Sequence, residues 1–179
     1  MDSIFRTTVE PVVDGPTTPV RVLKRDGSSV LLDSDQIRQD ILRCCVGFPD
    51  VDGDLIARKV VSGIHAGTTT RDIDLLSVQT AAALIAEDPQ YAKVAARLMS
   101  LYIGKEVFNQ SISSFTDSIR VSYDQGLIND RLLAFVQANS VALDAAIDVS
   151  RDGEFEYFGI RTVYDRYLLR HPQLRLVTE

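Results

Sequence analysis

Two short runs of β-prone residues around a polar turn predict a β-hairpin near the start of the chain. The runs are Val20–Leu23 and Val30–Leu32, and the polar segment between them contains Gly27. A glycine in a short turn between two such runs is typical of a hairpin. Residues 1–19, which precede it, are rich in proline and threonine, and this composition predicts a flexible leader.

Helical periodicity follows directly, with apolar residues recurring every three or four positions. Asp33 and Gln36 have the spacing of a capping box at the start of the first helix. Thr70 is a suitable N-cap for the third. The four helices are expected to begin at Asp33, near Asp52, at Thr70 and near Gln90, and to end at Gly47, at Gly67, before Pro89 and at about Phe108.

Further amphipathic segments predict a second helical unit. Apolar positions indicate three short helices between residues 115 and 147, and then a last helix that stops near Pro172. The pattern therefore predicts a mainly α fold with a small β-hairpin cap. A four-helix unit at residues 20–108 is followed by a second helical domain at residues 109–179.

The composition suits a globular protein and limits its partners. The 179 residues are 45% hydrophobic, and 25 Asp and Glu against 19 Lys and Arg give a net charge of −6. This acidic balance argues against non-specific binding to nucleic acid, which needs a basic face. No apolar run is long enough to span a bilayer, and the first residues lack the pattern of a signal peptide. We therefore expect a cytoplasmic protein without a nucleic-acid or membrane partner.

Cysteine and histidine are too few for a metal centre. Cys44 and Cys45 are adjacent, and the two histidines, His65 and His171, lie far apart. This pattern contains neither a disulfide framework nor a zinc-binding spacing. We expect the cysteines to pack as small, buried or half-buried side chains, and we assign no metal-binding residue.

Cations at a turn and near a helix end are candidates for anion binding. Lys24 and Arg25 beside Gly27 can aim charge-assisted hydrogen bonds at phosphate oxygens. The threonine-rich segment before the third helix offers N–H groups at a helix N-terminus. Each feature alone also fits a solvated turn or a simple helix cap, and a lysine such as Lys105 is ordinary near the end of a helix.

Taken together, these elements resemble a known regulatory module. Segments Val22–Gly27, Thr70–Ile73 and Tyr91–Leu98 are similar to the ATP-cone, which is found at the N-terminus of ribonucleotide reductase large subunits. The later segment Asp148–Arg170 resembles the helical N-terminal domain that precedes the catalytic barrel in the same subunits. The resemblance spans nearly the whole chain after the leader.

The resemblance implies an allosteric site for ATP, an activator, or dATP, an inhibitor, each accompanied by Mg²⁺. By this resemblance Lys24 and Arg25 face the nucleotide, Thr70 lies at the pocket rim and Lys105 reaches the phosphates. The site would control the overall activity with which the enzyme reduces ribonucleotides to deoxyribonucleotides for DNA synthesis.

Four positions depart from the family pattern. Asp33 stands where an amide is common, Asp74 where a histidine is common and Gln36 where a lysine is common. Val30 stands where the family often has a carboxylate. The added carboxylates and the lost lysine weaken the attraction for phosphate. The alternative is therefore a degenerate cone, which acts only as a subunit-interaction module and binds no nucleotide.

The resemblance also implies that catalysis lies outside this chain. The radical-bearing cysteine and the redox cysteines of the family belong to the barrel, beyond Glu179, so no catalytic residue is assigned. The implied partners are the rest of the large subunit, the radical-generating small subunit and further copies in a homo-oligomer. A repressor family that also carries the cone has a cysteine-rich zinc ribbon ahead of it, and residues 1–19 contain no cysteine.

Overall fold

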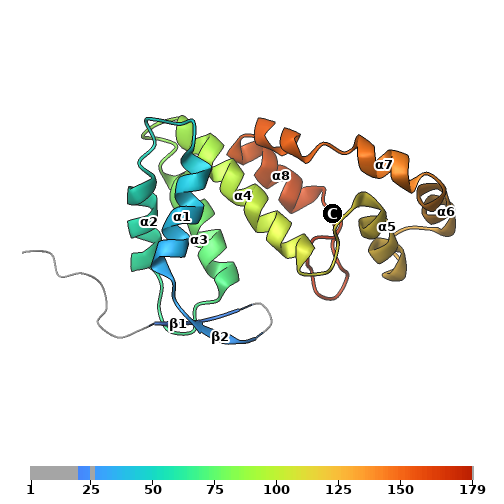
Figure 1. Ribbon diagram of the computed structural model, residues 1–179, viewed down its shortest axis with the longest axis horizontal. Helices are drawn as coiled ribbons and strands as arrows, with labels where there is room; N and C mark the ends of the chain where they lie inside the picture. Colours follow the sequence, from blue (N-terminus) through green and yellow to red (C-terminus); the bar gives the residue numbers. More distant parts are fainter. Residues whose placement is uncertain (1–19, 25–26, 179) are drawn as a thin grey trace, which may run out of the picture.

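The structure, a computed structural model, describes residues 20–24 and 27–178 (Figure 1). The predicted leader at 1–19 and the candidate site residue Arg25 lie outside the described residues. The described chain is mainly helical with a small two-stranded sheet, which confirms the predicted fold class. Within it no single helix is both long and apolar enough to cross a membrane. Only by their combined length and composition would one sharply bent pair of short helices be sufficient.

Two short strands form the hairpin that the apolar runs predict. Strands β1 (Arg21–Leu23) and β2 (Ser29–Leu31) are antiparallel, and Val22 lies opposite Val30. Val22 is buried, whereas both its neighbours in β1 are exposed. This alternation gives the hairpin one apolar face, which packs on the core at one end of the helices (Figure 1).

Four helices follow, as the periodicity predicts. Asp33 caps the first, because its carboxylate accepts a hydrogen bond from the Gln36 N–H at 2.9 Å. Gln36 does not complete the predicted capping box, since its side chain donates to Asp40 instead. The helices are α1 (Ser34–Cys45), α2 (Gly53–Ser62), α3 (Thr70–Ala83) and α4 (Gln90–Phe108).

Helix α2 is shorter than predicted and ends at Ser62 rather than at Gly67. After Ser62 the chain leaves the helix and then runs beside β1. The Leu23 N–H donates to the Thr68 carbonyl at 3.0 Å, and the Gly67 N–H donates to the Arg21 carbonyl at 3.3 Å. These bonds to the hairpin replace the last predicted turn of the helix.

The N-cap of α3 is Thr69 and not Thr70, which corrects the prediction by one residue. The Thr69 hydroxyl accepts a hydrogen bond from the Asp72 N–H at 3.0 Å, and the Asp72 carboxylate accepts one from the Thr69 N–H at 3.2 Å. This reciprocal pair is a capping box. Thr70 is therefore the first residue of the helix.

The rest of the described chain is helical, with shorter elements. A short 3₁₀ helix, η1, precedes α8, and α8 ends at Arg166 instead of near Pro172. The Arg170 guanidinium donates to the Tyr164 carbonyl near the end of α8, and the chain then folds back so that Arg170 pairs with Val177. The elements are α5 (Phe115–Asp124), α6 (Asp130–Ala138), α7 (Ser140–Ala146), η1 (Val149–Glu154) and α8 (Tyr157–Arg166).

Helix α8 packs along α4, although the two are far apart in sequence (Figure 1). Ile160 and Tyr164 of α8, together with Val177, are buried in the same apolar core as side chains of α1–α4. Helices α5, α6 and α7 extend to one side of this core. The two predicted parts thus share buried contacts, and the domain boundary at residue 108 stays a prediction.

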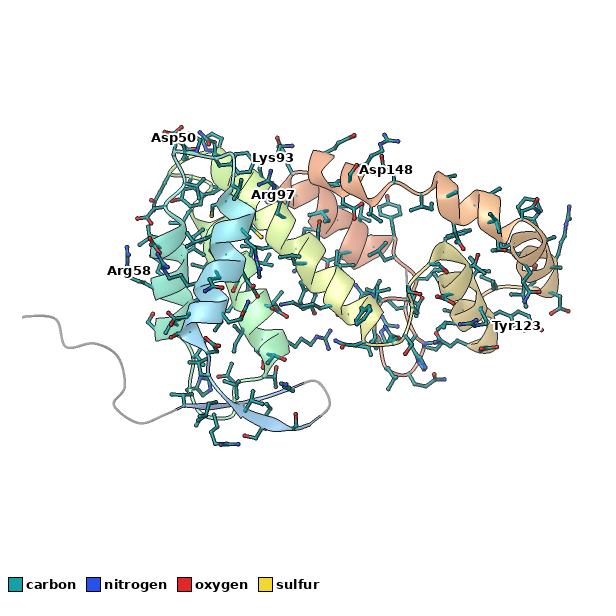
Figure 2. All side chains as sticks on the ribbon, viewed as in Figure 1. Asp50, Arg58, Lys93, Arg97, Tyr123 and Asp148 are labelled. Atoms are coloured by element: carbon teal, nitrogen blue, oxygen red, sulfur yellow. The ribbon has the colours of Figure 1, made fainter. Side chains whose placement is uncertain are left out.

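Two cationic side chains of α4 donate hydrogen bonds to backbone carbonyls of neighbouring elements (Figure 2). Arg97 donates to the carbonyls of Cys44 and Val46 at the end of α1, at 2.9 Å and 2.6 Å. Lys93 donates to the Glu154 carbonyl of η1 at 3.0 Å. A cation at a helix C-terminus satisfies carbonyls that have no partner within the helix. Helix α4 is thereby fixed to elements from both halves of the chain.

Candidate functional site

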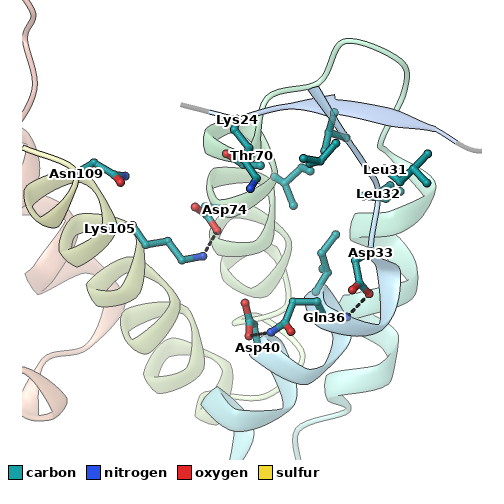
Figure 3. A pocket seen from close by; sticks show the side chains of 14 residues that line it. Lys24, Leu31, Leu32, Asp33, Gln36, Asp40, Thr70, Asp74, Lys105 and Asn109 are labelled. Atoms are coloured by element: carbon teal, nitrogen blue, oxygen red, sulfur yellow. Dashed lines mark hydrogen bonds and ion pairs between the residues drawn. The ribbon is translucent and has the colours of Figure 1, made fainter. Parts of the chain in front are cut away.

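The hairpin, α1, α3 and α4 surround an open cavity of about 440 Å³ (Figure 3). Five of the six predicted site residues line it, although they come from separate elements of the chain. The sixth, Arg25, lies outside the described residues. The five lining residues are Lys24, Asp33, Thr70, Asp74 and Lys105.

Lys105 and Asp74 form an ion pair at the cavity. Nζ of Lys105 in α4 lies 2.7 Å from Oδ1 of Asp74 in α3 (Figure 3). The Asp74 side chain is 20% exposed and the Lys105 side chain 45% exposed, so water screens the pair only in part. Any anion that reaches Lys105 competes with this carboxylate.

The α1 side of the cavity is hydrogen-bonded within the helix. Asp33 accepts from the Gln36 N–H, and the Gln36 side chain donates to Asp40 at 2.7 Å. Asp40 also pairs with Arg43. These contacts compensate part of the negative charge of both carboxylates.

The number of positive and negative side chains that line the cavity does not by itself favour an anion. Among the residues that the structure describes, two lysines, Lys24 and Lys105, face three aspartates, Asp33, Asp40 and Asp74. Helices α1 and α3 both begin at the cavity, and a helix N-terminus favours negative charge. The attraction for an anion therefore depends on the two lysines and the two helix starts acting together.

An apolar wall completes the cavity. It includes two valines of the hairpin, Ile37 of α1 and Ile73 of α3, and apolar walls of this kind suit a flat ring. The sequence does not reveal this wall, because such positions are also typical of a core. Asn109 lines the cavity as well, and its place one helical turn after Lys105 is the signal that would have identified it.

The two cysteines are not part of the cavity. Cys44 is buried and Cys45 half-buried at the end of α1. Burial raises the pKa of the Cys44 thiol to about 11 and also raises the pKa of Cys45. Both thiols are therefore neutral near pH 7, and neither is an activated nucleophile. In the part of the chain that the structure covers, no three His, Cys, Asp or Glu side chains are grouped to hold a metal ion.

The hairpin-capped helices and their cavity correspond to a described domain family. Residues 20–105 match the ATP cone domain family. The match runs from β1 through most of α4. It includes every residue that the sequence singles out for the site.

Over most of its length the chain is similar to a particular enzyme subunit. It is 33% identical over 83% of its length to the ribonucleoside-diphosphate reductase large chain of Schizosaccharomyces pombe. It is 32% identical over 83% and 84% of its length to the large subunits of Arabidopsis thaliana and Danio rerio. These matches cover 19%, 19% and 20% of the relatives, so the chain spans about a fifth of their length. The resemblance that the motifs indicate is confirmed.

Proposed function

We propose that this chain is the allosteric region of a ribonucleoside-diphosphate reductase large subunit, and that its cavity binds ATP or dATP. The supporting observation is the convergence of Lys24, Thr70 and Lys105 on one cavity within an ATP cone domain. The volume of about 440 Å³ also falls within the range of roughly 300–1,000 Å³ that is usual for small-molecule sites.

Five of the lining residues have distinct parts in holding the nucleotide. Lys24 and Lys105 donate charge-assisted hydrogen bonds to phosphate oxygens. The hydroxyl of Thr70 donates at the rim, where the start of α3 adds the positive end of its dipole. Ile37 and Ile73 pack against the adenine ring. Mg²⁺ arrives with the nucleotide, because phosphate oxygens are among its preferred ligands.

Binding of a polyphosphate changes the contact between two helices. A phosphate group that takes Lys105 weakens the pair with Asp74, which joins α4 to α3. ATP and dATP engage the same cations and differ only at the 2′ position of the sugar, so a difference in their effect arises there. The signal is a shift in population between packings of the cone against its neighbours.

The partners of this region follow from the reductase family. Reduction of ribonucleotides takes place in the rest of the large subunit and requires the radical-generating small subunit. This chain contributes no catalytic residue to the reaction. The regulated assembly is a homo-oligomer in the cytoplasm.

Calorimetric titration with ATP and with dATP, each with Mg²⁺, tests the nucleotide site. We expect micromolar binding to the wild type, and a loss of about 1.5–3 kcal/mol in Lys24→Ala, the value usual for a hydrogen bond to a charged group. Lys59→Ala is the matched control, since Lys59 is an exposed lysine of α2 that does not line the cavity. Equal affinities in the two variants would contradict the site.

A second candidate function is a degenerate cone that binds only other subunits. It is favoured by the three aspartates around two lysines and by the pairing of Lys105 with Asp74. A folded wild-type chain that releases no heat with either nucleotide, yet binds the rest of the large subunit, would support this candidate over the first.

A further inference from the structure

A buried carboxylate, Glu106, directly follows Lys105 in α4 but does not line the cavity. Glu106 is 3% exposed, and it accepts hydrogen bonds from three different segments. Arg71 of α3 donates to Oε2 at 3.2 Å, Tyr164 of α8 donates to Oε2 at 3.3 Å, and the Val177 N–H donates to Oε1 at 2.8 Å. Each of these donors would lose a buried partner without Glu106, so the carboxylate fixes all three segments to α4.

Tyr102 belongs to the same buried group. Its hydroxyl accepts a hydrogen bond from Arg71 Nε at 2.9 Å and lies 3.2 Å from the hydroxyl of Tyr164. The two tyrosine rings meet edge to face, with centroids 5.6 Å apart. Burial raises the pKa of Tyr102, which therefore stays a neutral phenol at ordinary pH. These contacts form a connected network that joins Arg71 of α3 to Tyr164 of α8 through α4.

Two ion pairs join α3 to α4 at neighbouring positions. The pair Asp74–Lys105, at 2.7 Å, lines the cavity, whereas the pair Arg71–Glu106, at 3.2 Å, belongs to the buried network. Arg71 directly follows Thr70 of the cavity, just as Glu106 follows Lys105. Consecutive residues of a helix point about 100° apart, so the two pairs lie on different sides of the contact between α3 and α4. Because both pairs join the same two helices, any rotation or slide of α3 against α4 alters both of them.

The segment Leu168–Thr178 is attached to the last turns of α4. The Val177 N–H bonds to Glu106, and the Val177 carbonyl accepts from the Gln110 side chain at 2.6 Å. Val177 is fully buried there. The position of this peptide group therefore depends on the orientation of α4 beyond Lys105.

We propose that Glu106 is a positioning residue that couples the cavity to the segment Leu168–Thr178, a role that rests on the proposed nucleotide site. When phosphate oxygens draw Lys105 away from Asp74, the alignment of α3 with α4 depends on the pair Arg71–Glu106. The resulting shift in this pair changes how tightly Glu106 holds the Val177 amide. Nucleotide thus alters the segment without touching it.

Amide hydrogen exchange of the full chain, with and without saturating Mg-ATP or Mg-dATP, tests this coupling. In the wild type we expect nucleotide to change the protection of the Val177 amide by roughly fivefold or more, the lower end of usual allosteric coupling. Glu106→Gln keeps the side-chain shape and an acceptor oxygen but removes the charge. We expect this variant to bind nucleotide in calorimetry and to lose the response at Val177.

Ser122→Ala is the matched control. It removes a hydroxyl contact of 3.3 Å to Thr178 and so loosens the same segment without touching the contact between α3 and α4. A merely structural tether would make both variants behave alike, whereas the coupling predicts that Ser122→Ala keeps the nucleotide response and Glu106→Gln loses it.

The outcomes separate the coupling from the nucleotide site itself. If Glu106→Gln does not fold, Arg71→Gln replaces it, because the Arg71 side chain is 43% exposed and its loss breaks the same pair. A response that persists in the folded variant overturns the coupling, as does a wild type that binds nucleotide without any change at Val177. A wild type that binds no nucleotide in calorimetry overturns the proposed site, and the coupling with it.

Discussion

Lys105 and Asp74 meet 2.7 Å apart at the cavity, and a bound phosphate has to share this lysine with the aspartate. Both side chains are partly shielded from water, so their attraction exceeds that of a fully exposed pair but does not prevent exchange with a stronger ligand. At the scale of single residues, this competition governs the proposed binding of a polyphosphate in the cavity.

Asp74→Asn should tighten ATP binding, because it removes the charge that competes for Lys105. A fully exposed ion pair contributes up to about 1 kcal/mol, and this pair is partly shielded from water, so we expect the dissociation constant to fall by about fivefold. Asp74→His, which introduces the residue common in the family, should act in the same direction. Asp35→Asn is the control, since Asp35 lies in the first turn of α1 without lining the cavity. No gain in affinity in either Asp74 variant would mean that Asp74 does not oppose the ligand.

The Cys44 thiol should react slowly with a disulfide reagent in the native state. Burial raises its pKa to about 11, so the reactive thiolate is only about one part in a thousand at pH 8. The rate should rise about tenfold per pH unit below the pKa. A native rate at pH 8 that equals the rate of the unfolded chain would contradict the burial of Cys44.

The sequence predicts residues that the structure brings to one cavity, but it does not predict how they pair. Local patterns single out Lys24 in its turn and Thr70 at its helix start, whereas Lys105 is implied only by the resemblance to the ATP-cone. The ion pair of Lys105 with Asp74 depends instead on how far α3 is rotated and shifted against α4. That rotation is set by packing throughout the core, which a local pattern does not contain.

At the scale of elements, the helix ends were the least predictable part of the fold. The periodicity locates the body of each helix correctly, but α2 ends early because residues 67–69 bond to β1. The start of α3 depends on which of two adjacent threonines faces the N–H groups of the first turn. Either threonine has a suitable hydroxyl, so composition alone cannot distinguish them.

Thr69→Ala should therefore affect stability, whereas Thr70→Ala should affect ATP binding. Thr69→Ala removes the capping box and should lower the free energy of unfolding by about 1 kcal/mol, with little change in ATP affinity. Thr70→Ala should leave stability nearly unchanged and weaken ATP binding. Denaturant unfolding and calorimetry on both variants check the pair, and a loss of stability in Thr70→Ala alone would reverse the assignment of the cap.

At the scale of the whole molecule, α8 connects the two predicted halves of the chain. Ile160 and Tyr164 are buried against α4, in the core that also contains residues of α1, α2 and α3. A helix some fifty residues beyond α4 thus helps to stabilise the cone, which the amphipathic pattern alone could not indicate. The apolar stripe of α8 indicates that one face of the helix is buried, but it does not indicate which element packs against that face.

Ile160→Ala should destabilise the cone as well as α8. Ile160 is 4% exposed, and truncation of such a core side chain costs about 2–5 kcal/mol. We expect one shared urea transition to move, and the slow amide exchange of Val60 in α2 to accelerate with it. Phe158→Ala is the control, because Phe158 is 70% exposed on the same helix. Faster exchange confined to α8 would indicate that the halves unfold separately.

The central claim is that the cavity between the hairpin, α1, α3 and α4 binds ATP or dATP. A titration of the isotopically labelled chain with Mg-ATP, followed by amide chemical shifts, tests it most directly. We predict saturable shifts at Lys24, in the first turns of α1 and α3, and at Lys105, all with one dissociation constant. The absence of shifts in a folded sample, or shifts confined to α5, α6 and α7, would contradict the claim.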